Sequence, residues 1–174
     1  MKPVIHPEPR PEILYTRLFK QKFERCLGLR PTRLDMVVPY IGGNPWGSPR
    51  GTCADFARLL MQIECDLHLI TLQPGTENAT LSADQAEELL KIGVELQIHT
   101  GNRLHAKIYQ FSFARSVKMA FVGSANFSMG GLVNNHETVA FFTARSDNVK
   151  VASEIHRISL ASIDYFPHFG VPSK

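Results

Sequence analysis

The chain has 174 residues, of which 44% are hydrophobic and 20% charged, and its formal net charge is +3. This composition is typical of one globular domain with a sizeable core and excludes the disordered and fibrous classes. The longest apolar runs are far shorter than the roughly 20 residues of a membrane-spanning helix, and residues 1–11 lack the apolar core of a signal peptide. We therefore expect a cytoplasmic protein that does not act at a membrane.

The cysteines and the basic residues are distributed unevenly. Cys26, Cys53 and Cys65 are odd in number and far apart, which predicts reduced, buried thiols instead of disulfides or a zinc cluster. Residues 1–33 hold eight Lys and Arg against three Glu, whereas residues 34–174 carry a small excess of acidic side chains. We expect residues 1–33 to form an N-terminal arm and a basic helix, and residues 34–174 to form the catalytic region of what is one domain overall.

In chain order, residues 1–11 contain four prolines, which favour an extended arm. Apolar residues at helical spacing predict an amphipathic helix over residues 12–27, whose basic face either lies along phosphates or is simply solvated. The apolar run 34–41 predicts a strand buried on both faces. In the Gly/Pro-rich loop that follows, Trp46 either contacts a substrate or packs against the core.

The central part of the chain alternates between helix and strand patterns. Thr52 is a candidate N-cap for a helix that runs to about residue 64, and a strand over 66–72 follows. Ser82 and Gln85 have capping-box spacing for a second helix, which ends at Gly93. A strand over 94–98, two strands within 104–122, a strand over 138–142 and a helix over 147–163 complete the prediction. This order favours an α/β fold in which a mixed β-sheet is sandwiched between helices.

Most of the chemically capable side chains lie between residues 103 and 137. In the segment LHAKIYQF, His105 and Lys107 alternate with apolar residues, so we expect both to point to the same side of one strand. The next strand runs into Gly123-Ser124-Ala125-Asn126, where the Ser and Asn side chains can bind phosphate oxygens. Asn135 and Glu137 come just before the following strand, and Asn135 is either a site residue or a turn residue.

The pattern H-x-K followed by G-S-x-N and N-x-E resembles the phospholipase D superfamily, and most closely the catalytic domains of its metal-independent restriction endonucleases. The superfamily's full motif has an aspartate five residues after the lysine, where this chain has Ser112. The resemblance implies a phosphodiesterase that works through a covalent phosphohistidine on His105. It implies roles for Lys107, Ser124 and Asn126 in binding phosphate, and for Glu137 in orienting a histidine. Arg103 is a candidate for a further phosphate contact.

The chain has one H-x-K motif and no internal repeat. A covalent route needs a nucleophile on one side of phosphorus and an acid on the other, and one imidazole cannot fill both positions. We therefore expect a homodimer with a composite active site. No tight cluster of Asp or Glu near His105 is available for Mg²⁺, so we expect activity without a metal or other cofactor.

Three functions fit these residues. DNA cleavage is favoured, either by the catalytic domain of a restriction-type endonuclease, with sequence recognition supplied by a separate domain or subunit, or by a stand-alone nonspecific nuclease. A phospholipase-type phosphodiesterase acting on another ester would use the same chemistry. A catalytically silent module for dimerisation or DNA binding is the third, and it would be insensitive to His105→Ala.

Overall fold

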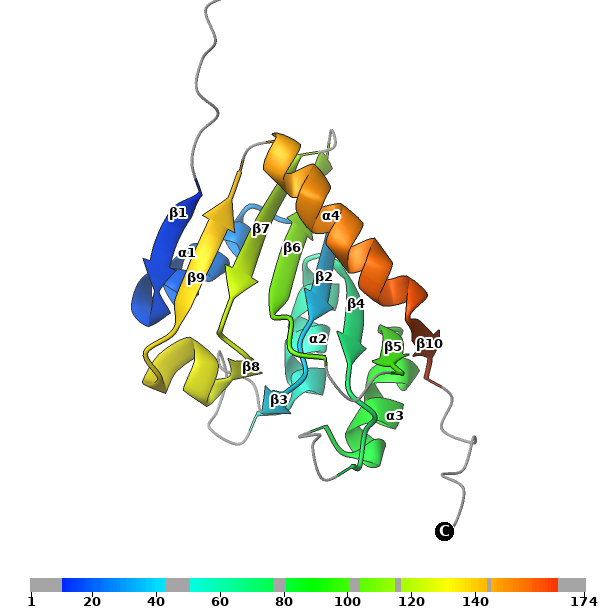
Figure 1. Cartoon of the computed structure of the whole chain (residues 1–174). Helices are drawn as coiled ribbons and strands as arrows, with labels where there is room; N and C mark the ends of the chain where they lie inside the picture. Colours follow the sequence, from blue (N-terminus) through cyan, green and yellow to red (C-terminus); the bar gives the residue numbers. More distant parts are fainter. Residues whose placement is uncertain are drawn as a thin grey trace, which may run out of the picture.

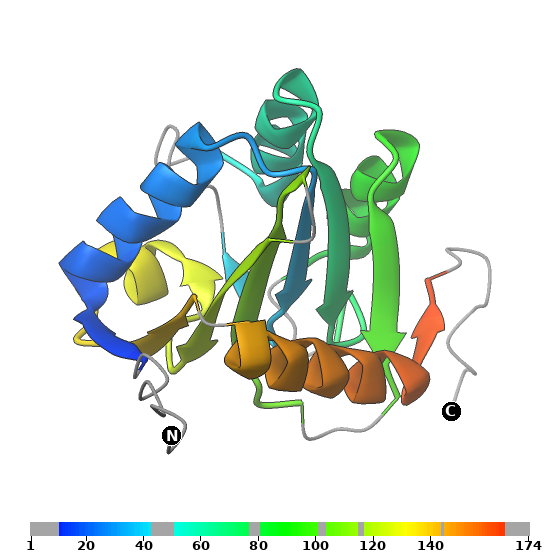
Figure 2. The same ribbon diagram turned by 90° about the horizontal axis from the view of Figure 1, so that it is seen from above.

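A computed structural model describes residues 11–42, 51–76, 81–100, 104–114, 117–143 and 145–165. Its centre is an eight-stranded mixed sheet with the order β1-β9-β7-β6-β2-β4-β5-β10. Helix α4 crosses one face of this sheet, and α1, α2 and α3 cover the other (Figures 1 and 2). The predicted α/β fold, a mixed sheet sandwiched between helices, is confirmed.

The main sheet combines parallel and antiparallel pairs. Strands β2, β4 and β5 are parallel neighbours, whereas β1, β9, β7 and β6 form an antiparallel series that joins β2, and β10 is antiparallel to β5. The strands of the main sheet are β1 (Glu12–Tyr15), β2 (Arg33–Val37), β4 (Asp66–Thr71), β5 (Glu95–His99), β6 (Ile108–Ser112), β7 (Lys118–Gly123), β9 (Thr138–Phe142) and β10 (Ser162–Asp164).

Two further short strands and five helical segments complete the described fold. Strands β3 (Ile41–Gly42) and β8 (Phe127–Ser128) form a small parallel pair. The helical segments are α1 (Thr16–Gly28), α2 (Cys53–Gln62), α3 (Ala83–Lys91), the π-helix η2 (Gly130–Asn134) and α4 (Arg145–Leu160). None of the helices within the described ranges is long and apolar enough to cross a membrane.

The two faces of the sheet have different cores. Beneath α1 and α2 the core is aromatic: the ring of Phe23 meets that of Phe111 at 4.8 Å between centroids, edge to face, and Phe19, Tyr109 and Phe121 surround them. Each such pair contributes about 0.5–1.5 kcal/mol beyond its burial. The face beneath α4 is mainly aliphatic. Because β6 contributes side chains to both cores, its position in the sheet is firmly fixed.

The predicted helix starts of α2 and α3 are confirmed. Thr52 and Asp55 form a reciprocal capping box on α2, and Ser82 and Gln85 do the same on α3. These side chains satisfy backbone N–H groups that have no partner within the helix. Gly93 follows α3 with φ of 88°, a left-handed conformation that glycine adopts without strain.

Several element boundaries differ from the prediction. The predicted strand 34–41 divides into β2, which ends at Val37, and the short β3, which begins at Ile41. Residues 12–15 form strand β1 instead of the first turn of the helix, because they pair with β9, more than 120 residues away. The last helix ends at Leu160, and β10 follows and pairs with β5. Strands β1 and β10 depend on distant partners that the local spacing of apolar residues does not reveal. The predicted arm, residues 1–10, lies outside the described residues.

The cysteines are free and buried, as predicted. Burial raises the pKa of the Cys26, Cys53 and Cys65 thiols to about 12. The thiolate is the reactive form of cysteine, so these three side chains act as small core residues.

Candidate active site

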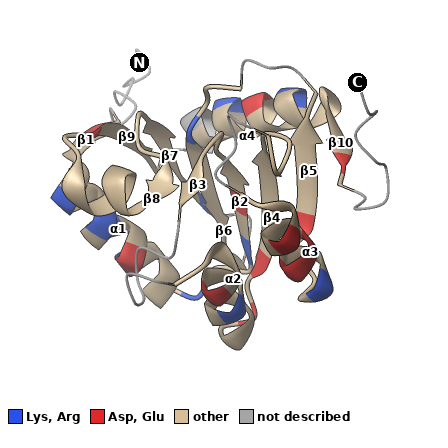
Figure 3. Cartoon of the chain, turned by 90° about the horizontal axis from the view of Figure 1, so that it is seen from below, with Lys and Arg blue, Asp and Glu red and all other residues tan. Residues whose placement is uncertain are grey.

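The three candidate motifs meet at one edge of the sheet. Strand β6 begins at Ile108, opposite Val122 near the end of β7, and Gly123 lies opposite Val139 near the start of β9. The residues just before β6, just after β7 and just before β9 therefore gather at the same edge. This edge is at the bottom of Figure 1 and faces the viewer in Figure 3, beside β3 and β8.

Lys107 is buried at this edge, with 4% of its surface exposed. Its Nζ donates a hydrogen bond to the backbone oxygen of His105 at 2.9 Å. Burial lowers the pKa of the Lys107 ammonium, and the nearby carboxylate of Glu137 partly opposes this effect. A buried ammonium with one backbone partner has donors left for an anion, which would also compensate for the lost hydration.

Glu137 is the hub of the polar contacts at this edge. Its Oε2 accepts a hydrogen bond from the Ser124 hydroxyl, and its Oε1 accepts one from Asn135 Nδ2 at 3.2 Å. The Ser124 hydroxyl also accepts from the backbone N–H of Thr138 at 3.1 Å. These bonds place the carboxylate between the end of β7 and the loop that leads into β9.

Two glycines allow the backbones here to approach closely. A Cβ atom on Gly123 would overlap the backbone oxygen of Thr138, and one on Gly131 would overlap the backbone oxygen and nitrogen of Asn126. The close approach of β9 therefore requires glycine at position 123. Any other residue at Gly131 would displace the segment that carries Asn126.

Asn126 has an unpartnered polar atom. The preceding residue is fixed because the Tyr109 hydroxyl donates to the backbone oxygen of Ala125 at 2.9 Å, and the following residue enters β8. The Asn126 Oδ1 atom is buried and has no hydrogen-bond partner among the described residues. A buried polar atom without a partner costs about 1–3 kcal/mol. Rotating the amide by half a turn presents its N–H donors at the same point, where a bound anion would satisfy them.

His105 is exposed, and no hydrogen bond joins its ring to another described residue. Residues 104–107 precede β6, so the prediction that His105 and Lys107 belong to one strand is wrong. The Lys107 side chain turns back to the backbone of His105, which interrupts the expected alternation. Glu137 bonds to Ser124 and Asn135 and not to His105 in this single chain, so its role in orienting histidine stays a prediction. Arg103 and Trp46 lie outside the described residues.

Ser112, at the motif's aspartate position, lies at the opposite end of β6 from His105. It pairs with Arg33 and Lys118, and its backbone oxygen accepts a hydrogen bond from Thr32 N at 2.8 Å. The serine that replaces the motif's aspartate therefore lies at the far end of β6 from the edge where Lys107 and Glu137 lie.

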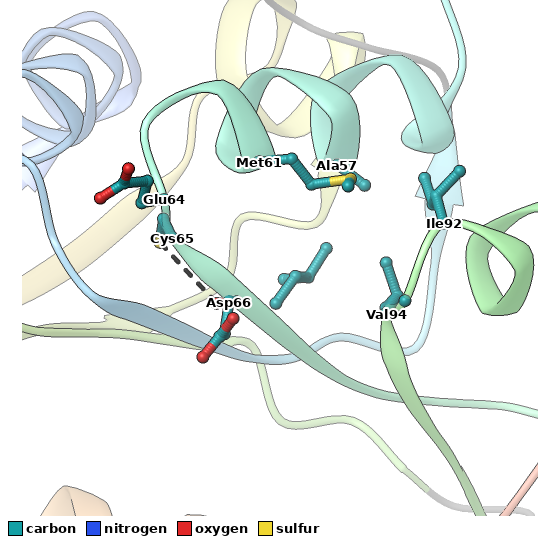
Figure 4. A pocket seen from close by; sticks show the side chains of 9 residues that line it. Ala57, Met61, Glu64, Cys65, Asp66, Ile92 and Val94 are labelled. Atoms are coloured by element: carbon teal, nitrogen blue, oxygen red, sulfur yellow. Dashed lines mark hydrogen bonds between the residues drawn. The ribbon is translucent and has the colours of Figure 1, made fainter.

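A pocket elsewhere in the molecule has a different character. It has a volume of about 380 Å³ and lies between the end of α2, the start of β4 and the segment after α3 (Figure 4). Its walls include Ala57, Met61 and Val94, and the Cys65 thiol bonds to the backbone oxygen of Asp66. None of the predicted site residues lines this pocket, so it does not belong to the candidate active site.

Similar solved structures share the fold at low sequence identity. Nuc from Salmonella typhimurium, a phospholipase D family member, aligns with a TM-score of 0.62 and 14% identity over 89% of this chain and 98% of its own. NucT from Helicobacter pylori aligns with a TM-score of 0.60 and 13% identity over 90% of this chain and 99% of its own. The archaeal chromatin protein TrmBL2 is described as having a novel mode of DNA binding. It aligns with a TM-score of 0.55 and 11% identity over 95% of this chain and 58% of its own.

No curated protein matches the chain. Residues 31–159 match the family described as "Cardiolipin synthase, PLD-like domain". This range includes the three motifs at the sheet edge and extends from just before β2 into the last turn of α4. The chain therefore belongs to the phospholipase D-like domain family.

Proposed function

We propose that the chain is a metal-independent phosphodiesterase that cleaves DNA through a covalent phosphohistidine on His105. One observation carries the proposal: an exposed histidine, a buried ammonium and a Ser–Glu–Asn cluster meet where β6, β7 and β9 come together. Lys107 and Asn126 have hydrogen-bonding capacity that their described neighbours do not use. A phosphodiester offers the two non-bridging oxygens that such donors would bind.

The proposed reaction has two displacements. A ring nitrogen of one His105 attacks phosphorus, the bond from phosphorus to the leaving oxygen breaks, and that oxygen takes a proton from the imidazolium of a second His105. The second imidazole then removes a proton from water, whose oxygen attacks phosphorus and breaks the P–N bond. Both histidines return to their starting states. Lys107 and Asn126 stabilise the charge on the non-bridging oxygens in both displacements.

Because each chain has a single His105, the second His105 has to come from another copy of the chain. The mechanism therefore requires a homodimer in which two copies of this sheet edge face each other. We expect the twofold axis to pass close to His105, so that both imidazoles reach one phosphorus atom. If the site is composite, a dimer with one defective subunit should be inactive. Independent sites would instead retain activity in proportion to the intact subunits.

DNA is favoured as the substrate by the basic character of α1. Arg17 and Arg25 are exposed on this helix, and neither has an ion pair within the described part of the chain. Figure 3 shows Lys and Arg along α1 and acidic residues on α3. Phosphate contacts from such a face would make binding sensitive to salt. We propose a restriction-type catalytic domain whose sequence recognition comes from a separate domain or subunit.

The first experiment measures plasmid cleavage in EDTA by the wild type, His105→Ala and His156→Ala. His156 is a matched control because it is also exposed but lies on α4. We expect cleavage by the wild type and the control and none by His105→Ala. Loss of wild-type activity on chelation would contradict the metal-independent route.

The second experiment tests the composite site. Wild type and His105→Ala are mixed, denatured and refolded together. With equal amounts, we expect about one quarter of the activity of the same total amount of wild type, because only dimers with two intact subunits work. Independent sites would give about one half.

Two other functions give different results. A phospholipase-type phosphodiesterase would hydrolyse a small phosphodiester but would not cut DNA at any salt concentration. A silent module for dimerisation or DNA binding would cleave neither substrate, and His105→Ala would not alter its DNA affinity. The serine at the motif's aspartate position is the specific observation that favours the silent module.

A further inference from the structure

A threonine at the start of α1 holds the loop that carries Glu137. The Thr16 hydroxyl donates a hydrogen bond to the backbone oxygen of Asn135 and accepts one from the backbone N–H of Glu137 at 2.9 Å. The side chain is buried, with 9% of its surface exposed. One hydroxyl group thus satisfies a carbonyl and an N–H from the same three-residue loop, and no other described side chain bonds to this pair of backbone groups.

The position of Thr16 is itself well fixed. Tyr15 pairs with Thr138 at the end of the β1–β9 ladder, so Thr16 comes next to Glu137 just beyond the last pair. The same helix packs Phe19 and Phe23 into the aromatic core, which prevents its first turn from shifting. The backbone of the loop is therefore held by an element anchored in the core.

The backbone of Glu137 determines where its carboxylate lies. With the loop held by Thr16, the carboxylate reaches both Ser124 and Asn135 and influences the buried ammonium of Lys107. Displacement of the loop would break the bond to Ser124 and move the carboxylate relative to Lys107, which both lie outside the loop. The chain of contacts thus runs from the core, through Thr16, to the charged groups of the candidate site.

We propose that Thr16 is a positioning residue of the active site, which sets the location of Glu137 without touching the substrate. This inference rests on the proposed function for its effect on catalysis. The sequence gives no local signal for this role, because Thr16 and the loop are separated by 119 to 121 residues.

The test compares Thr16→Val, which keeps the shape but removes the hydroxyl, with Thr16→Ser, which keeps the hydroxyl. For Thr16→Val we expect kcat for plasmid cleavage to fall roughly 10- to 100-fold with little change in KM, because the site is misaligned and not blocked. The pH dependence of kcat should also change, since the carboxylate near the reacting groups has moved. Thr16→Ser should restore both.

A matched control is Ser82→Ala, which also removes a hydroxyl that bonds to a backbone N–H, but at the start of α3. It should lower the melting temperature and leave kcat and its pH dependence unchanged. If Thr16→Val behaves in the same way as this control, Thr16 is only structural and the inference is overturned.

Hydrogen exchange separates this inference from the proposed function. The Glu137 amide should exchange faster in Thr16→Val than in the wild type and return to the wild-type rate in Thr16→Ser. If the wild type cleaves no phosphodiester, the proposed function fails, and the exchange rates still decide whether Thr16 holds the loop. An active wild type with unchanged exchange in Thr16→Val would overturn the inference alone.

Discussion

His68 and His105 belong to the same fold but have opposite surroundings. His68 lies in β4 with 5% of its surface exposed; its Nδ1 is 3.0 Å from an Asp35 oxygen and its Nε2 is 3.3 Å from Gln97 Oε1. His105 is exposed before β6, and its ring has no hydrogen bond to a described residue. Of the two, only His105 is exposed and has no hydrogen bond from its ring to the described part of the chain.

The His68 cluster shows how a sheet accommodates buried charge. Asp35, His68 and Glu95 are in direct register on three neighbouring strands, and Arg33 bonds to Asp35 at 2.8 Å. Burial alone would raise the pKa of the Asp35 carboxyl, but hydrogen bonds from His68 and Arg33 outweigh this and hold the pKa below its ordinary value. At the candidate site, by contrast, a lysine and an asparagine keep hydrogen-bonding capacity that a phosphate could use. Paired polar groups stabilise the fold, and incompletely paired groups at an edge are available for chemistry.

The largest difference should appear on comparing His105→Ala with His68→Ala. His105→Ala should reduce cleavage at least about 1000-fold, since it removes the proposed nucleophile, while the free energy of unfolding changes by less than about 0.5 kcal/mol. His68→Ala should do the reverse, with a clear loss of stability and near-normal kcat in the folded fraction. Urea denaturation and plasmid cleavage measure the two effects, and equal effects on both would contradict the comparison.

The next largest effect is on stability. Asp35→Ala leaves His68 and Arg33 without their shared acceptor, and we expect it to lower the free energy of unfolding by about 3–5 kcal/mol. Cleavage per folded molecule should stay close to wild type, because Asp35 lies within the sheet and not at its edge. A large fall in kcat for the folded variant would mean that the two regions are coupled.

Gly131→Ala tests the close packing beneath Asn126. The added Cβ overlaps backbone atoms of Asn126, so we expect a loss of about 1–3 kcal/mol and a reduction in kcat as that segment moves. Gly28→Ala is a suitable control, because a Cβ there meets nothing within 4 Å. Wild-type kcat and stability in Gly131→Ala would show that the segment tolerates the shift.

The smallest expected effect is the pH dependence of the contribution that Asp35 makes to the free energy of unfolding. A carboxyl with a lowered pKa in the folded state stabilises the protein above its unfolded pKa of about 3.9, and this contribution is lost as the pH falls through the folded value. The stability difference between wild type and Asp35→Asn should therefore be constant near neutral pH and shrink below about pH 4. Urea denaturation at several pH values measures it, and a constant difference down to pH 2 would contradict the assignment.

The fold was largely predictable because the helices and strands of its centre have strong local signals. The capping boxes at Thr52 and Ser82 and the apolar strands before and after them need no distant information. Strands β1 and β10 were missed because each exists only through pairing with a strand far away in the chain. The π-helix after Gly130 was also missed, since its tight packing against Asn126 is a tertiary requirement.

The residue types of the candidate site were predictable, but their arrangement was not. The pattern that holds His105, Lys107 and Ser124 resembles the phospholipase D superfamily, and this resemblance implies phosphodiester chemistry. Antiparallel pairing of β6, β7 and β9 brings these residues and Glu137 to one edge. The burial of Lys107 and its bond to the backbone of His105 could not be predicted from the alternation of polar and apolar residues in this segment. The contact from Thr16 also had no local signal.

The most direct test of the central claim is to trap the covalent intermediate. The protein is mixed with a DNA substrate in EDTA, quenched within the first turnover, and its intact mass and peptide masses are measured. We predict an acid-labile phosphoramidate adduct, in which a P–N bond joins His105 to a cleaved DNA strand, in the wild type and none in His105→Ala. Cleavage without any adduct on His105, or with an adduct on another residue, would contradict the proposed mechanism.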